Sequence, residues 1–225
     1  MKKIGLIGAM EVEIENIKNA MTDVTAYEIA ASTFFEGKLG NTNVVLSCSG
    51  VGKVNAAVNA QILVSVFGCD CLINTGIAGN LSEKLKLGDF VIADSVIYHD
   101  FDLDIFASAA PFTKTLTPDA DLIDSLSATL TQMNIPFMVG TVATGDVFVQ
   151  DSETKQRIID LTQGLCTEME GAAIGHVAAR NGVPFGIIRC ISDNSDDESV
   201  YDNFFEEAAN LCSSITIKTL ENLSK

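Results

Sequence analysis

The sequence predicts an α/β fold in which a mixed, mainly parallel twisted sheet is flanked by helices on both faces. Three observations predict it. Short β-rich apolar runs alternate with longer amphipathic segments, glycine and polar residues follow most of these runs, and Gly37–Asn43 has the composition of a hairpin turn. The 225 residues, 47% hydrophobic and 20% charged, can form one large core, so we expect a single domain over residues 1–225.

The expected elements follow from this alternation. The strands are expected at Lys3–Ile7, Tyr27–Glu36, Asn43–Ser47, Cys71–Asn74, Asp89–Tyr98, Phe137–Thr144, Leu165–Thr167 and Pro184–Ile191. The helices are expected at Met10–Ala20, Lys53–Phe67, Ala120–Met133, Ser152–Leu161, Glu170–Asn181 and Asp202–Leu223. The least regular stretch, Asp100–Pro118, is expected to be a long loop, and such loops in compact domains are usually functional or disordered.

Composition excludes several classes of function. The net charge of −16 disfavours nucleic acids and anionic membranes as partners, and the longest apolar runs are too short to span a bilayer. Six cysteines form no CxxC pair and only His99 and His176 could assist them, so we expect no zinc site. Free thiols and a start without a secretory pattern favour the cytoplasm. A small neutral or zwitterionic substrate is compatible with this surface.

Glycine and polar residues gather after the predicted strands. They lie in Gly8–Glu13, Ser49–Lys53, Asn74–Gly79, Thr144–Val149, Glu168–Gly171 and Ser192–Asp193. Open α/β sheets bind ligands at the carboxyl ends of their strands, so these segments predict one binding site. The Gly50-Val51-Gly52-Lys53 turn matches neither a Walker loop nor a dinucleotide fingerprint. A tight turn that touches a ligand through its backbone is favoured there over phosphate binding.

Three carboxylates stand out at this rim. Taken alone, Glu13 reads as an exposed helix residue, Glu170 and its neighbour Glu168 as residues that start a helix, and Asp193 as a cap or turn. Their joint placement at the ends of neighbouring strands favours a catalytic site.

The same segments resemble the motifs of methylthioadenosine/adenosylhomocysteine nucleosidases, which belong to the purine nucleoside phosphorylase and uridine phosphorylase superfamily. The resemblance runs nearly end to end and in the family's order, over Ile4–Glu13, Ser49–Val54, Asn74–Gly79, Gly145–Val149, Glu168–Glu170 and Arg189–Asp193. It implies a three-layer α/β fold, a homodimer, and hydrolysis of an adenine nucleoside without metal or cofactor. It also implies that the Asp100–Pro118 segment reaches into the partner subunit's site.

The resemblance implies that Asp193 protonates adenine N7 and that Glu13 activates the attacking water. Adenine leaves poorly until it is protonated, and water on the opposite face of the sugar needs a base, so the chemistry calls for two such carboxylates. The remaining roles fall to residues of the same motifs. Glu170 binds the ribose hydroxyls, Met169 packs on the sugar, Phe148 stacks on adenine, the Val149 backbone reads its edge, Arg189 orders the carboxylates, and Met10, Val51, Ile77, Ser192 and Tyr201 complete the substrate site.

Two positions depart from the family's pattern. Ile77 stands where a serine is usual, which removes or replaces a polar contact, and Tyr201 stands where a phenylalanine is usual, near the expected 5′-substituent pocket. The Asp100–Pro118 segment is also shorter than usual. The preferred 5′-substituent is therefore left open among methylthio, homocysteinyl, 5′-deoxy and the carboxylated group of aminodeoxyfutalosine.

Two other functions compete. A phosphorylase of the same fold needs several cations around phosphate, but the chain has only three arginines and carries Asn74 and Ile77 where the family's phosphorylases have arginine and serine. A non-catalytic nucleoside-binding protein would not need Glu13, Glu170 and Asp193 together. The sequence therefore favours a nucleosidase.

Overall fold

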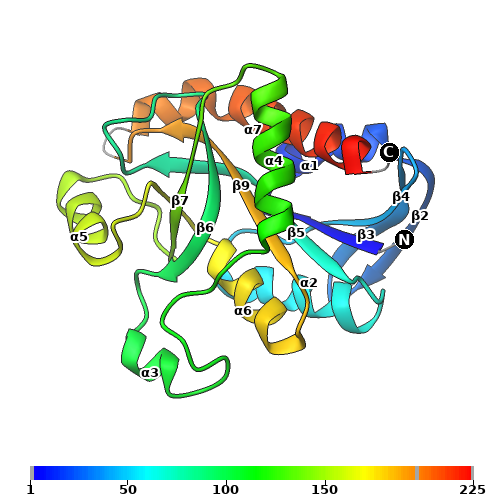
Figure 1. Cartoon of the computed structure of the whole chain (residues 1–225), viewed down its shortest axis with the longest axis horizontal. Coiled ribbons are helices and arrows are strands. Elements are labelled where there is room, and N and C mark those ends of the chain that lie inside the picture. Colours follow the sequence, from blue (N-terminus) through cyan, green and yellow to red (C-terminus); the bar gives the residue numbers. More distant parts are fainter. Residues whose placement is uncertain (1–2, 196–197, 224–225) are drawn as a thin grey trace.

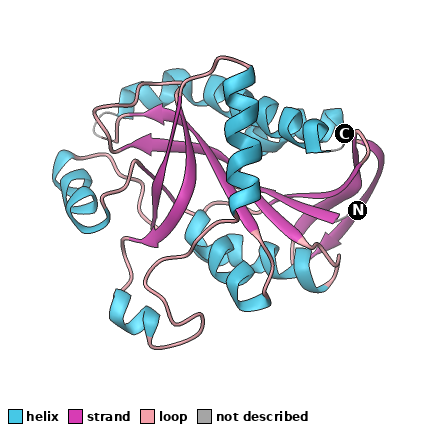
Figure 2. Ribbon diagram, in the orientation of Figure 1, coloured by secondary structure: helices cyan, strands magenta, loops and turns pink. Residues whose placement is uncertain are grey.

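Nine strands form one mixed sheet in the computed structural model, which describes residues 3–195 and 198–223 and, for residues 198–203, the backbone alone (Figures 1 and 2). The strands are β1 (Lys3–Gly8), β2 (Thr22–Ile29), β3 (Ser32–Leu39), β4 (Thr42–Cys48), β5 (Cys71–Asn80), β6 (Phe90–Tyr98), β7 (Phe137–Thr144), β8 (Cys166–Glu168) and β9 (Phe185–Asp193). The helices are α1 (Glu11–Ala20), α2 (Lys53–Ser65), α3 (Leu103–Ala107), α4 (Ala120–Gln132), α5 (Ser152–Thr162), α6 (Gly171–Asn181) and α7 (Glu198–Leu223).

The sheet order is β2-β3-β4-β1-β5-β8-β7-β6-β9, with a further pairing between β5 and β9. Parallel pairs join β1 to β4 and β5, β5 to β9, and β7 to β6 and β8. Antiparallel pairs join β3 to β2 and β4, β5 to β8, and β6 to β9. Strands β5, β9, β6, β7 and β8 therefore close into a ring, and β1 to β4 extend from it. The mixed sheet of the predicted fold class is confirmed.

Helices cover both faces, as Figure 1 shows: α1, α4 and α7 on one side and α2 and α6 on the other. Strand β1 shows how the sequence supplies both faces, because alternate side chains point to opposite sides of a sheet. Ile4 and Leu6 pack with the α1 side chains Ile14 and Ile17, whereas Ile7 belongs to the cluster that α2 and α6 complete. None of the described helices has the length and apolar character needed to cross a membrane.

The expected single strand Tyr27–Glu36 is wrong, because the chain reverses inside it. Strands β2 and β3 form an antiparallel hairpin whose two turn residues, Ala30 and Ala31, have φ of 51° and 59°. Such turns normally carry asparagine or glycine, so two alanines gave no turn signal. The predicted hairpin turn at Gly37–Asn43 is confirmed, since β3 ends at Leu39 and β4 begins at Thr42 in antiparallel register.

Strand β5 does not end at Asn74 as expected but continues to Asn80, because Thr75–Ala78 still pair with β9. The glycines Gly76 and Gly79 therefore do not mark the end of the strand. Side chains from neighbouring elements lie directly over both of them, where a Cβ would not fit. Helix α7 begins at Glu198 rather than Asp202, and the Asp100–Pro118 segment contains a short helix, α3, whose N-terminus is capped by Asp102.

Candidate functional site

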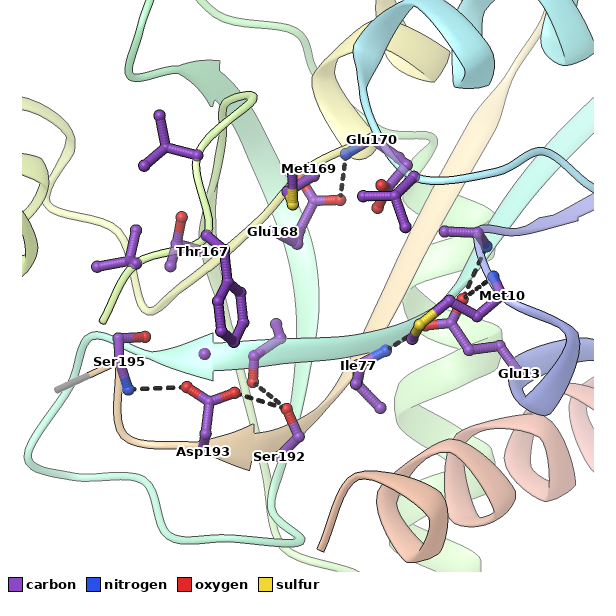
Figure 3. A pocket seen from close by; sticks show the side chains of 17 residues that line it. Met10, Glu13, Ile77, Thr167, Glu168, Met169, Glu170, Ser192, Asp193 and Ser195 are labelled. Atoms are coloured by element: carbon purple, nitrogen blue, oxygen red, sulfur yellow. Dashed lines mark hydrogen bonds between the residues drawn. The ribbon is translucent and has the colours of Figure 1, made fainter. Parts of the chain in front are cut away.

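A cavity of about 360 Å³ opens at the carboxyl ends of β1, β5, β8 and β9 (Figure 3). Its volume lies in the range of small-molecule sites. Ten of the residues that the sequence proposes line it: Met10, Glu13, Val51, Ile77, Phe148, Val149, Met169, Glu170, Ser192 and Asp193. Arg189 lies outside the lining, beside Glu168, and the side chain of Tyr201 lies outside the described residues.

Glu13 sits in the first turn of α1 and turns back toward the helix N-terminus. Its Oε2 accepts hydrogen bonds from the backbone N–H groups of Ala9 (2.7 Å) and Met10 (3.0 Å), and its Oε1 accepts one from Ile77 (2.9 Å). The side chain is 2% exposed. Burial raises the pKa of Glu13, while Arg189 and the three N–H donors lower it, and burial prevails. A buried carboxylate with a raised pKa is suited to accept a proton.

Asp193 ends β9 on the other side of Ile77 from Glu13 (Figure 3). The hydroxyl of Ser192 donates to its Oδ2 and the backbone N–H of Ser195 donates to its Oδ1, both at 2.8 Å. These bonds fix the carboxyl group against the sheet edge while it still lines the cavity. Glu13 and Asp193 therefore approach one cavity from two elements that are 180 residues apart in the chain.

Arg189 connects the remaining carboxylates beneath the cavity. The guanidinium is fully buried, donates to Glu168 and to the side-chain oxygen of Asn74, and lies 3.6 Å from Glu170 Oε2. Asn74 in turn donates to the backbone oxygen of Ile7 at 2.9 Å, which fixes the arginine relative to β1. A buried arginine needs such anionic partners, because an unpaired buried charge is strongly unfavourable.

Glu168 and Glu170, at the start of α6, have different hydrogen-bond partners. Glu168 accepts hydrogen bonds from Thr144 and from the backbone N–H groups of Glu170 (3.0 Å) and Gly171 (2.7 Å). Its two carboxylate oxygens are therefore occupied by groups of the protein itself. Glu170 accepts a hydrogen bond from Gly52 N–H at 2.9 Å and lines the cavity. Burial and then the neighbouring Glu168 raise the pKa of Glu170 to about 7, against the lowering effects of Arg189 and Gly52.

Seven further residues line the cavity that sequence reasoning did not assign to the substrate: Ala9, Ala78, Gly79, Val147, Thr167, Glu168 and Ser195. Most of them lie within the identified motifs, and Thr167 adjoins one. Ser195 gave no signal, because it stands beyond the end of β9 in a polar stretch that resembles an ordinary turn.

The Asp100–Pro118 segment divides into a part that packs on its own chain and a part that does not. Phe106 is buried against Tyr98 and His176, with ring centroids 5.2 and 5.0 Å apart. Ile105 and Phe112 are instead 61% and 73% exposed. Phe106 therefore belongs to the core of its own chain, whereas Ile105 and Phe112 leave apolar surface exposed.

Comparisons with known proteins agree with this geometry. Residues 3–223 match the family described as the phosphorylase superfamily. The 5'-methylthioadenosine/S-adenosylhomocysteine nucleosidase of Staphylococcus aureus (strain MRSA252) is 36% identical over 224 residues, covering 96% of this chain and 98% of that protein. The chain belongs to this nucleosidase family of the phosphorylase superfamily.

Solved structures of nucleosidases superpose over nearly the whole chain. S-adenosylhomocysteine nucleosidase from Streptococcus pyogenes, in complex with 5-methylthiotubericidin, has a TM-score of 0.94 and 34% identity, covering 99% of this chain and 97% of that one. Futalosine hydrolase of Helicobacter pylori strain 26695 has a TM-score of 0.92 and 27% identity, covering 98% of each chain. The nucleosidase fold therefore extends across the sheet and the helices that form the cavity.

Proposed function

We propose that the protein hydrolyses the N-glycosidic bond of 5′-methylthioadenosine and S-adenosylhomocysteine, releasing adenine and the thioribose product. The observation that carries the proposal is the placement of Asp193 and Glu13 on either side of Ile77 in one cavity (Figure 3). The relatives named for this activity match the chain from end to end. 5′-Deoxyadenosine is a further candidate substrate, because it shares the adenine and the ribose.

Asp193 acts as the general acid at adenine N7. An ordinary aspartic acid is ionised at neutral pH, so its proton must be favoured by its surroundings. A purine nitrogen beside the carboxyl group of Asp193 can share this proton. Protonated adenine leaves as a neutral base, and positive charge develops on the ribosyl carbon, as in an oxocarbenium ion.

Glu13 acts as the general base for water. The atoms Glu13 Oε1 and Arg189 Nη1 both lie less than 3.0 Å from the point that a Cβ on Gly76 would occupy. Arg189 Nη1 has no hydrogen-bond partner among the described residues, although it is buried. Glu13 lines the cavity, so a water molecule on the cavity side of its carboxylate can give its proton to Glu13 and attack the ribosyl carbon.

The other contacts position the nucleoside. Glu170 binds the ribose hydroxyls with Met169 packed on the sugar, while Phe148 stacks on adenine and the Val149 backbone reads its edge. Ser192 supports this arrangement through its hydrogen bond to Asp193. The apolar residues Met10, Val51 and Ile77 complete the wall of the cavity around the nucleoside.

Hydrolysis is favoured over phosphorolysis by the charges around the cavity. Among the described residues that line it, none is a lysine or an arginine. Arg189 is engaged by Glu168 and Asn74, and Lys53 Nζ, on the adjoining turn, lies 2.7 Å from Asp100. A phosphate ion would meet several carboxylates and no free cation, which is unfavourable.

The test is adenine release from methylthioadenosine with and without phosphate. We expect equal rates and a free sugar in both cases, and formation of a sugar 1-phosphate would contradict hydrolysis. The second candidate is an aminodeoxyfutalosine-type nucleosidase, which the structural likeness to futalosine hydrolase favours. The rates of adenine release from methylthioadenosine, S-adenosylhomocysteine, 5′-deoxyadenosine and aminodeoxyfutalosine distinguish the two candidates.

The protein is proposed to act as a single-domain chain over residues 1–225, in the cytoplasm and as a homodimer. No disulfide joins cysteines among the described residues, which suits a reducing compartment. The exposed Ile105 and Phe112 lie in the segment proposed to complete the partner subunit's site, and such side chains favour burial in an interface.

A further inference from the structure

The hydroxyl of Ser195 is an unexplained polar group in the wall of the cavity. Ser195 is 2% exposed, yet its Oγ has no hydrogen-bond partner among the described residues. A buried hydroxyl without a partner is unfavourable, and most buried polar groups are hydrogen-bonded. Because Ser195 lines the cavity, a bound molecule can supply the missing partner.

The backbone holds this hydroxyl in a fixed place. Ser195 has a φ of 58°, a left-handed conformation that is uncommon for serine. Its N–H donates to Asp193 Oδ1, and the preceding carbonyl of Asn194 accepts a hydrogen bond from Lys155 Nζ at 2.6 Å. Residues in such conformations are often found at functional sites, where the surroundings over-determine them.

The hydroxyl points to the same place as the proposed acid. Ser195 Oγ and Asp193 Oδ1 both lie less than 3.0 Å from the point that a Cβ on Gly79 would occupy. Figure 3 shows the two residues side by side at the end of β9, and both line the cavity. A base whose N7 faces Asp193 therefore presents its next atoms to Ser195.

In a purine, the group next to N7 on that edge is the substituent at position 6, an amino group in adenine and an oxygen in guanine. A serine hydroxyl can accept a hydrogen bond from an amino group. We propose that Ser195 is a specificity-determining residue that hydrogen-bonds the 6-amino group of the base. The inference rests on the proposed function, because it requires adenine N7 to face Asp193.

The experiment compares two substrates and three proteins. The substrates are 5′-methylthioadenosine and the matching nucleoside whose purine carries hydrogen at position 6. The proteins are the wild type, Ser195→Ala and Ser47→Ala. Ser47 is a matched control because it is fully buried, its Oγ also has no described partner, and it is not among the residues that line the cavity.

We expect Ser195→Ala to lower kcat/KM for methylthioadenosine about 3- to 10-fold, the usual effect of one lost neutral hydrogen bond. It should leave kcat/KM for the 6-unsubstituted nucleoside unchanged, and Ser47→Ala should change neither value. Equal losses on both substrates, or no loss on either, would overturn the proposal. If the wild type released no adenine at all, the proposed function itself would fail, and that result is distinct from a failure of Ser195→Ala to discriminate.

Discussion

Replacement of Glu13 by glutamine tests the proposed general base and the structure around it together. The carboxylate accepts three backbone N–H bonds, two at Oε2 and one at Oε1. Glutamine has one carbonyl oxygen and one amino group. If the oxygen accepts from Ala9 and Met10, the amino group faces the N–H of Ile77, and two donors oppose each other.

The effect on stability follows from this count. At least one buried N–H loses its acceptor, which costs about 1–3 kcal/mol. In a chain of this size, each 1 kcal/mol shifts Tm by roughly 2–4 °C, so we expect a decrease of about 2–12 °C. Loss of the base should lower kcat by about 10²–10⁴-fold.

Asp193→Asn provides the contrast. The asparagine oxygen can still accept from Ser195 N–H, and its amino group can donate to Ser192 Oγ, whose own proton can turn to the backbone oxygen of Ala78. All these groups keep partners, so Tm should change little while kcat falls by a similar factor. The two variants should therefore differ in stability although both lose turnover.

The assay is initial-rate adenine release at saturating methylthioadenosine, with thermal unfolding of the same preparations. Glu15→Gln, an exposed exchange on the same helix, is the matched control and should change neither quantity. A Glu13→Gln protein that is folded and turns over near the wild-type rate would refute the assignment of the base. An unchanged Tm of Glu13→Gln would show that no buried N–H group loses its acceptor.

The remaining predictions concern pH, cosubstrates and assembly. The folded chain raises the pKa of Glu170 from 4.5 to about 7, so its contribution to stability is complete below pH 4.5 and is lost as the pH rises through 7. The Tm of Glu170→Gln relative to wild type should therefore rise over this interval, and a constant difference would contradict the shift. A chelator should leave adenine release intact, and a rate restored only by added metal would contradict metal-free hydrolysis. If Ile105 and Phe112 cover the partner's site, dilution into monomers should lower specific activity. Phe112→Ala should then raise KM more for thioether substrates than for 5′-deoxyadenosine. A fully active monomer would disprove this role of the segment.

Sequence reasoning predicted the rim of the sheet well, because strands, glycines and carboxylates are local signals. Glu13 and Asp193 each follow an apolar run, and the carboxyl ends of adjoining parallel strands meet at one edge. The pairing of Arg189 with Glu168 and Asn74 could not be derived in this way. It depends on β5 lying between β1 and β9 and on the antiparallel contact of β5 with β8, which no local pattern specifies.

The glycines of β5 show the same limit. As sequence they mark the end of a strand, but in the structure they provide space for side chains that come from elsewhere. The hairpin of β2 and β3 could not be predicted because the sequence has no turn residue there. Ala30 and Ala31 adopt a turn that their side chains do not favour. Local propensity therefore failed where tertiary contacts determine the backbone.

Gly76→Ala tests whether turnover depends on the position of the Glu13 carboxylate, without removing a functional group. The new Cβ would lie less than 3.0 Å from Glu13 Oε1 and Arg189 Nη1, and neither can withdraw easily, since Ile77 N–H holds the first and Glu168 binds the arginine. A displacement of about 1 Å at a reacting group can lower kcat by about 10²-fold. The control is Gly186→Ala in β9, where the added Cβ meets only Leu122, at 3.2 Å or more, so kcat should stay near the wild-type value. If Gly76→Ala folded with a Tm close to that of the control and kept wild-type kcat, turnover would not depend on the present position of the Glu13 carboxylate.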